Sequence, residues 1–187
     1  MSSKVSTFNS VKMNNYRYLF IIVGWTDYVT PVTEELQKQF EPFGASLGSA
    51  GVVVQAYKSS AIGTFEEVKN KDWDPELLRR FESEQQPFML VLEKDFDRFD
   101  PTRDPFGIIW FSDYEKEPST VTSTLHQLAL KTKEGHDLFD YLHSLQRKRT
   151  VSRVGKYFEV KPKILWLSVD AKAIVSDITK VIRRRRT

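Results

Sequence analysis

Residues 88–111 read FMLVLEKDFDRFDPTRDPFGIIWF, two apolar segments that flank a polar one. The apolar segments, 88–92 and 106–111, are rich in aromatic and branched side chains, which predicts two buried strands. The connection at 95–105 holds two prolines and has no helical period. Parallel neighbours need a crossover of about a dozen residues or more, usually a helix. We therefore predict that the two strands are joined by an antiparallel hairpin or a wide turn, within a mixed sheet.

The rest of the chain alternates further strand patterns with helical ones. Buried strands are also predicted at 16–25, 52–57 and 157–169. Helices are predicted at 30–40, from Asp74 to the residues before Pro87, at 119–150 and at 170–182. Pro42 and Gly44 are expected to end the first helix, and Gly135 is expected to bend or split the third. The predicted fold class is α/β, with a mixed sheet of about five strands flanked by four or five helices in a single domain.

The predicted domain organisation is simple. Residues 1–15 are rich in Ser, Asn and Lys without any period, which indicates a disordered leader. Residues 16–187 are expected to form one α/β domain with a basic C-terminal helix. The chain has no cysteine, which excludes disulfides and thiolate metal sites. It has no signal-peptide pattern and no apolar run of about 20 residues, so we expect a soluble, cytoplasmic protein without a membrane span.

Charge is divided unevenly along the chain. Residues 147–187 hold thirteen Lys and Arg against three acidic residues, a net charge of +10, while residues 1–146 carry −7. The two basic clusters are Arg147, Lys148 and Arg149, and Arg183, Arg184, Arg185 and Arg186. Cations stabilise the carboxyl ends of helices by about 0.3–1 kcal/mol each, but the effect fades within one turn. Four consecutive arginines therefore indicate an anionic partner.

The two basic clusters predict a nucleic-acid-binding site, because phosphates spaced along a nucleic acid neutralise such runs. An anionic membrane surface, an acidic protein, a nuclear-import role and a solvated end without a specific partner are alternatives. No helix-turn-helix, zinc-finger or RNA-recognition pattern supports sequence-specific reading of bases. The first hypothesis is a non-enzymatic regulatory or adaptor domain that binds nucleic acid or another polyanion through its basic C-terminal end.

Carboxylates that follow the predicted strands lead to a second hypothesis. The acidic set comprises Asp27, Glu93, Asp95, Asp97, Asp100, Asp104 and Asp113. Acids at the carboxyl ends of parallel strands bind Mg²⁺ and serve phosphoryl chemistry. A Mg²⁺-dependent enzyme acting on nucleic acid or nucleotides would use Asp27, Asp95, Asp97 or Asp113. An antiparallel hairpin would instead separate Asp95 from Asp113 and leave a solvated loop stiffened by its prolines.

Histidines and exposed aromatic residues give weaker indications. His136, Asp140 and His143 would share one face of a continuous helix, but no metalloprotease pattern accompanies them, which favours structural histidines. Trp73 and Tyr114 lie in predicted loops and are candidates for stacking contacts. The sequence assigns no catalytic residue and no metal ligand, and it does not identify a cofactor.

A third hypothesis uses the same charge division in another way. The acidic body and the basic end could pair with a partner protein or with a second copy of the chain, which would make the protein an interaction subunit. None of the three hypotheses rests on a motif that specifies a reaction, so the sequence favours a binding protein over an enzyme.

Overall fold

The computed structural model describes residues 1–24, 29–83, 87–112, 118–147 and 158–161. The strands are β1 (Ser2–Val5), β2 (Tyr18–Val23), β3 (Gly51–Ala56), β4 (Phe88–Leu92), β5 (Phe106–Trp110) and β6 (Phe158–Lys161). The α-helices are α1 (Pro31–Leu47), α2 (Ala61–Lys69), α3 (Pro75–Ser83), α4 (Ser119–Lys133) and α5 (Leu138–Arg147). Three short 3₁₀ helices are η1 (Phe8–Ser10), η2 (Lys58–Ser60) and η3 (Phe96–Arg98).

The six strands form one mixed sheet in the order β1-β3-β2-β4-β5-β6. Strands β1, β3 and β2 are parallel, and β4 is antiparallel to both β2 and β5. Leu92 lies opposite Phe106, so the connection at 95–105 closes a hairpin as predicted. The predicted α/β class with a mixed sheet is therefore confirmed, and the described residues contribute six strands where about five were expected.

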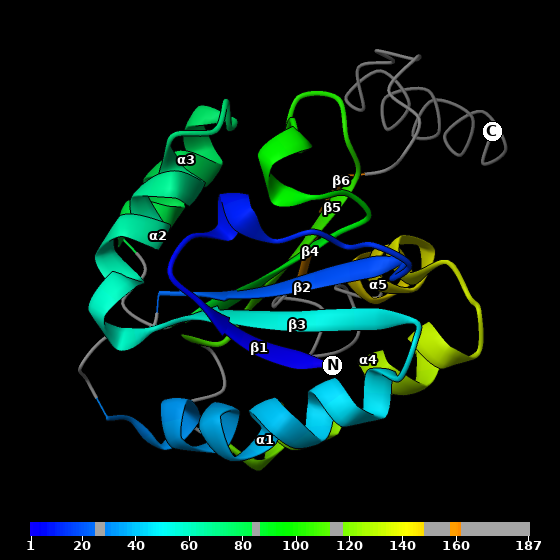
Figure 1. Cartoon of the computed structure of the whole chain (residues 1–187). Coiled ribbons are helices and arrows are strands. Elements are labelled where there is room, and N and C mark those ends of the chain that lie inside the picture. Colours follow the sequence, from blue (N-terminus) through cyan, green and yellow to red (C-terminus); the bar gives the residue numbers. More distant parts are fainter. Residues whose placement is uncertain (25–28, 84–86, 113–117, 148–157, 162–187) are drawn as a thin grey trace, which may run out of the picture.

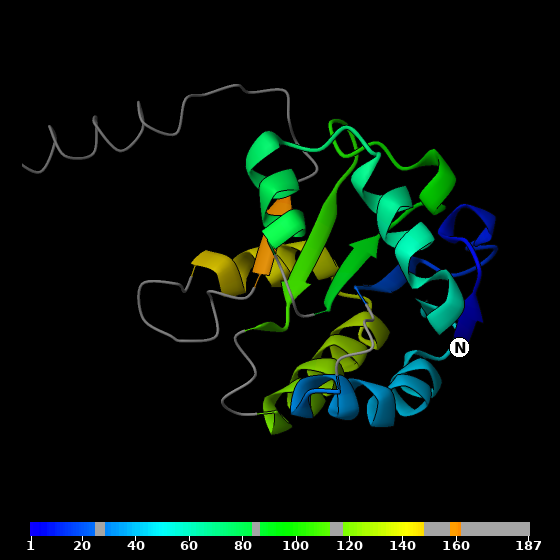
Figure 2. The ribbon, with the colours of Figure 1, turned by 90° about the vertical axis from the view of Figure 1, so that its left-hand side faces the viewer.

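Helices cover both faces of the sheet, which gives three layers (Figure 1). Helices α1, α4 and α5 pack on one face, and α2 and α3 pack on the other (Figure 2). All six residues of β2 are buried, because alternate side chains enter the two cores. A strand that is covered on both sides reads as a continuous apolar run, which explains the clear signal in this segment.

The N-terminal residues differ from the disordered leader that the sequence predicts. β1 forms the edge of the sheet beside β3, with Ser2 opposite Val53. The ring of Phe8 is fully buried, and its backbone N–H donates to the carboxylate of Glu67 at 2.8 Å. These partners lie about 50 to 60 positions away in the chain, so no local period in residues 1–15 could reveal them.

Helix α1 continues past the two residues that were expected to end it. It contains Pro42 and runs to Leu47, where Gly48 with φ +60° follows. Proline inside a helix costs about 3 kcal/mol. Burying the side chains of Phe43 and Leu47 contributes about 1.5–3 kcal/mol each, which offsets that cost.

The helical stretch after residue 119 is split, as the sequence predicts. α4 ends at Lys133, Gly135 adopts φ +74°, and α5 begins at Leu138. The N–H of Leu138 donates to the hydroxyl of Tyr18 at 3.0 Å, which ties the start of α5 to the start of β2.

Two predicted elements fall largely or wholly outside the described residues. Of the strand expected at 157–169, the structure describes only β6, and the helix expected at 170–182 is not among the described residues. In the part of the chain that is described, no helix has the length and apolar character needed to cross a bilayer.

Candidate nucleic-acid interface

The structure places only the beginning of the basic region. Arg147 is the last residue of α5. The other members of the two basic clusters lie outside the described residues: Lys148, Arg149, Arg183, Arg184, Arg185 and Arg186. β6 pairs antiparallel with β5 and ends at Lys161, opposite Phe106. The chain therefore enters residues 162–187 from the edge of the sheet where β4 ends and β5 begins, which we call the hairpin end.

The strands that precede the members of the acidic set do not all end at one edge of the sheet. Val23 at the end of β2, Phe88 at the start of β4 and Trp110 at the end of β5 lie in one row. Asp95 follows the other end of β4 and lies at the hairpin end. Asp27 and Asp113 lie outside the described residues, but the strands that precede them end at the opposite edge. The hairpin therefore puts Asp95 and the strand end that precedes Asp113 at opposite edges, the separation that the sequence predicts for antiparallel strands.

The carboxylates at the hairpin end organise their own loop. Asp95 accepts a hydrogen bond from the N–H of Met13 at 2.7 Å, which fixes the N-terminal segment to the loop. Asp104 accepts from the N–H of Asp100 at 3.0 Å. Asp100 in turn accepts from the N–H and the hydroxyl of Thr102 at 2.8 and 2.6 Å. Such local side-chain to backbone bonds are typical of turns, so these acids have a structural role.

Basic side chains of the body face the same carboxylates. Lys12 Nζ lies 2.5 Å from Asp97, Lys94 is paired with Asp104, and Arg17 lies 3.8 Å from Glu93. The hydrogen bond from Lys12 holds the pKa of Asp97 below its usual value. Within the described residues, no group of three or more acidic or histidine side chains could hold a metal ion.

Lys71 contacts the backbone and an aromatic ring of the loop, a role that the sequence does not reveal. Its Nζ donates to the carbonyl of Phe99 at 3.0 Å and lies 4.7 Å from the centre of the Phe96 ring. Burial lowers the pKa of Lys71. The lysine reaches these groups from 25 or more positions away, so no spacing rule could identify it.

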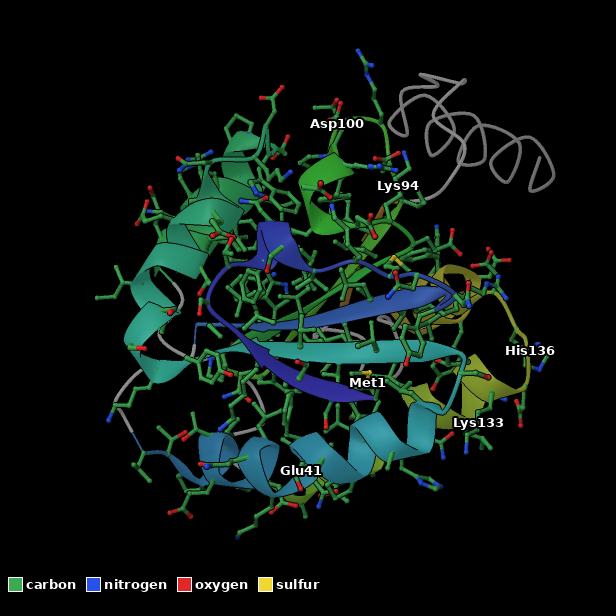
Figure 3. The ribbon with its side chains drawn as sticks, in the orientation of Figure 1. Met1, Glu41, Lys94, Asp100, Lys133 and His136 are labelled. Carbon is green, nitrogen blue, oxygen red and sulfur yellow. The ribbon has the colours of Figure 1, made fainter. Side chains whose placement is uncertain are left out.

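An open hollow of about 520 Å³ lies between this loop and the N-terminal segment. Its lining residues are Lys12, Met13, Asn14, Tyr16, Glu93, Lys94, Asp95 and Arg98. The side chain of Lys94 is 52% exposed, and Figure 3 shows it with Asp100 at the hairpin end. Arg98 is exposed, and no described carboxylate forms an ion pair with it. Its charge acts on the neighbouring Asp97 and helps to lower the pKa of that carboxyl, so Arg98 is compensated in part without a direct ion pair.

The histidine and aromatic candidates do not add to this site. His136 lies in the turn between α4 and α5, beside Glu134 at 3.4 Å, so it is not on a helical face with Asp140 and His143. Trp73 is only 6% exposed and donates from Nε1 to the carbonyl of Val68 at 2.6 Å. The expectation that Trp73 is an exposed stacking residue is therefore wrong. Tyr114, the other aromatic candidate, lies outside the described residues.

Comparisons with known proteins found no matching family model, no matching curated protein and no matching solved structure. Function must therefore be argued from the chemistry of the chain itself.

Proposed function

We propose that this protein is a non-enzymatic regulatory or adaptor domain that binds nucleic acid through its basic C-terminal end. The charge division carries the proposal: a +10 segment follows a −7 body. The residues proposed to contact phosphates are Arg147, Lys148, Arg149, Arg183, Arg184, Arg185 and Arg186. Such contacts supply affinity that depends on salt and not on sequence.

The electrostatics of the body support an external partner. Neighbouring guanidinium groups about 6 Å apart repel one another by about 0.7 kcal/mol in water. At the hairpin end, Asp95, Asp97 and Asp104 already face lysines or backbone amides of the body. These carboxylates already have partners within the body, whereas a nucleic acid provides further, closely spaced negative charges.

The deciding experiment is a salt titration of binding to single-stranded DNA, RNA and duplex DNA. A chain truncated after Ile182 should bind at least tenfold more weakly near 150 mM salt, since each single-strand phosphate contact contributes about 0.7 to the slope of log affinity against log salt. Replacing the four arginines by lysine should retain most of the slope, and replacing them by glutamine should reduce it as truncation does. Unchanged affinity after truncation would reject the proposal. Stronger binding to anionic vesicles than to nucleic acid would reassign the partner.

For the enzyme hypothesis, the candidate acids divide between the two edges of the sheet. Asp27 and Asp113 follow β2 and β5, which end at the same edge of the sheet, whereas Asp95 and Asp97 lie at the other. Mg²⁺-dependent cleavage of an oligonucleotide that is lost in both Asp27→Ala and Asp113→Ala variants would favour an enzyme over a binding domain.

A further inference from the structure

The hollow lies at the hairpin end of the sheet, where β6 also ends. Lys161, Phe106 and Leu92 occupy one row across β6, β5 and β4. Two strand spacings amount to about 10 Å. β4 continues directly from Leu92 into Glu93 and Lys94, which line the hollow. The last described residue of β6 therefore lies about two strand spacings from the strand that leads into the hollow.

The charged side chains that line the hollow differ in whether they already contact groups of the protein. Asp95 is directed to the N–H of Met13, and Glu93 lies beside Arg17, so both acids are engaged with groups of the protein. Arg98 forms no direct ion pair among the described residues, although its charge acts on the neighbouring Asp97. An incoming phosphate would be met first by Arg98, whose planar guanidinium forms paired hydrogen bonds with phosphate oxygens.

The volume of the hollow and the aromatic ring in its lining both suit a nucleotide. Its volume of about 520 Å³ lies within the range of small-ligand sites, about 300–1,000 Å³. Tyr16 contributes a half-buried ring to the lining, held by contact of its hydroxyl with the sulfur of Met1 at 3.3 Å. A fixed aromatic ring beside a cation is the combination that binds unpaired bases in single-stranded nucleic acid.

We propose that this hollow is a nucleotide subsite for single-stranded nucleic acid, with Arg98 on a phosphate and Tyr16 stacked on a base. The inference rests on the proposed function, because the subsite takes the same nucleic acid that the basic clusters are proposed to bind. The charges around the hollow are nearly balanced, so the subsite alone binds weakly. Tethering raises the local concentration of the strand and makes the second contact effective.

The test measures affinity for a single-stranded oligonucleotide and for the matching duplex across a salt series. Arg98→Gln should weaken single-strand binding about 3- to 10-fold and reduce the salt slope by about 0.7, the value for one phosphate contact. Tyr16→Leu should weaken single-strand binding about 5- to 100-fold, as expected for loss of one stacked base. The same Tyr16 substitution should leave duplex binding nearly unchanged.

Matched controls separate the hollow from general charge and aromatic effects. Arg103→Gln removes an arginine of the same loop that is 84% exposed, pairs with Asp100 and does not line the hollow. Tyr57→Leu removes an exposed tyrosine after β3, at the opposite edge of the sheet. Both control variants should bind as the unmodified chain does, and thermal unfolding verifies that all four variants are folded.

The outcomes distinguish this inference from the proposed function. If truncation after Ile182 abolishes binding while Arg98→Gln and Tyr16→Leu bind normally, the subsite is rejected and the C-terminal interface stands. If the truncated chain binds normally, the proposed function fails and the tethering argument fails with it. Equal loss in Arg98→Gln and Arg103→Gln would show a diffuse charge effect and would also reject the subsite. Loss confined to the two hollow variants supports it.

Discussion

Glu35 and Thr122 join the two long helices that cover one face of the sheet. The carboxylate of Glu35 on α1 accepts a hydrogen bond from the hydroxyl of Thr122 on α4 and another from the Gln39 amide at 3.1 Å. The first of these bonds is the largest reason that the pKa of Glu35 is lowered. Its contribution to stability is therefore present above the unfolded-state pKa, about 4.3, and is lost as the pH falls through the lower folded-state value.

This bond gives a prediction about pH. Thr122→Val keeps the shape of the side chain and removes the donor, so we expect it to lower the free energy of unfolding by about 1–2 kcal/mol at neutral pH. The difference from the unmodified chain should shrink as the carboxylate is protonated in acid. Urea unfolding at several pH values measures both effects. Thr122→Ser retains the hydroxyl and serves as the control, and an equal loss for Ser and Val would contradict the role of the bond.

Residue-level predictions from sequence succeed when the cause is local. The cap of α3 is an example, since Asp74 accepts from the N–H of Glu76 two positions later. Trp73 is a counterexample, because its burial depends on rings at 81, 99 and 106 that only the fold brings together. The position of Arg98 beside the hollow could not be predicted either, because its surroundings include the N-terminal segment.

The elements show the same division between local and distant causes. The length and prolines of the connection at 95–105 were enough to predict the β4–β5 hairpin. β1 and α2 were not predicted, because β1 has only four residues and α2 buries only Thr64 and Val68. Short elements of this kind owe their stability to packing and not to propensity.

A pair of helical glycines tests how firmly β1 belongs to the sheet. A Cβ atom on Gly44 of α1 would lie 2.6 Å from the Cβ of Ser2 and 2.8 Å from the carbonyl carbon of Met1, so Gly44→Ala must displace β1. A Cβ on Gly63 of α2 would meet no atom within 4 Å. Ala gains about 1 kcal/mol over Gly inside a helix, and overpacking costs about 1–3 kcal/mol.

We expect Gly63→Ala to stabilise the protein by about 0.5–1 kcal/mol and Gly44→Ala to give no gain or a loss. Hydrogen exchange gives the specific readout, because the N–H groups of Val53 and Tyr57 donate to Met1 and Val5 of the N-terminal strand. Both amides should lose protection in Gly44→Ala and keep it in Gly63→Ala. Equal gains in stability with unchanged protection in both variants would mean that Gly44 does not hold β1 in place.

At the scale of the whole molecule, the charge division allows two kinds of partner. A nucleic acid can neutralise the basic end, or the acidic body of a second copy can. The structure reduces what the acidic body of a second copy can offer. Asp97 and Asp104 at the hairpin end are already paired with Lys12 and Lys94 of the same chain. Contacts between copies would then consist of exposed ion pairs, which contribute about 0–1 kcal/mol each.

Self-association should therefore be weak and confined to low salt. The Debye length shortens from about 30 Å at 0.01 M to about 8 Å at 0.15 M ionic strength, which screens exposed pairs between copies. We expect sedimentation velocity to show a monomer near 0.15 M salt and some association near 0.01 M. A single-stranded oligonucleotide should reverse that association, because it competes for the same arginines and offers a higher density of charge. A dimer that persists at high salt and in the presence of the oligonucleotide would favour the interaction-subunit hypothesis, because its contacts could not then be the screened ion pairs of a charge-divided chain.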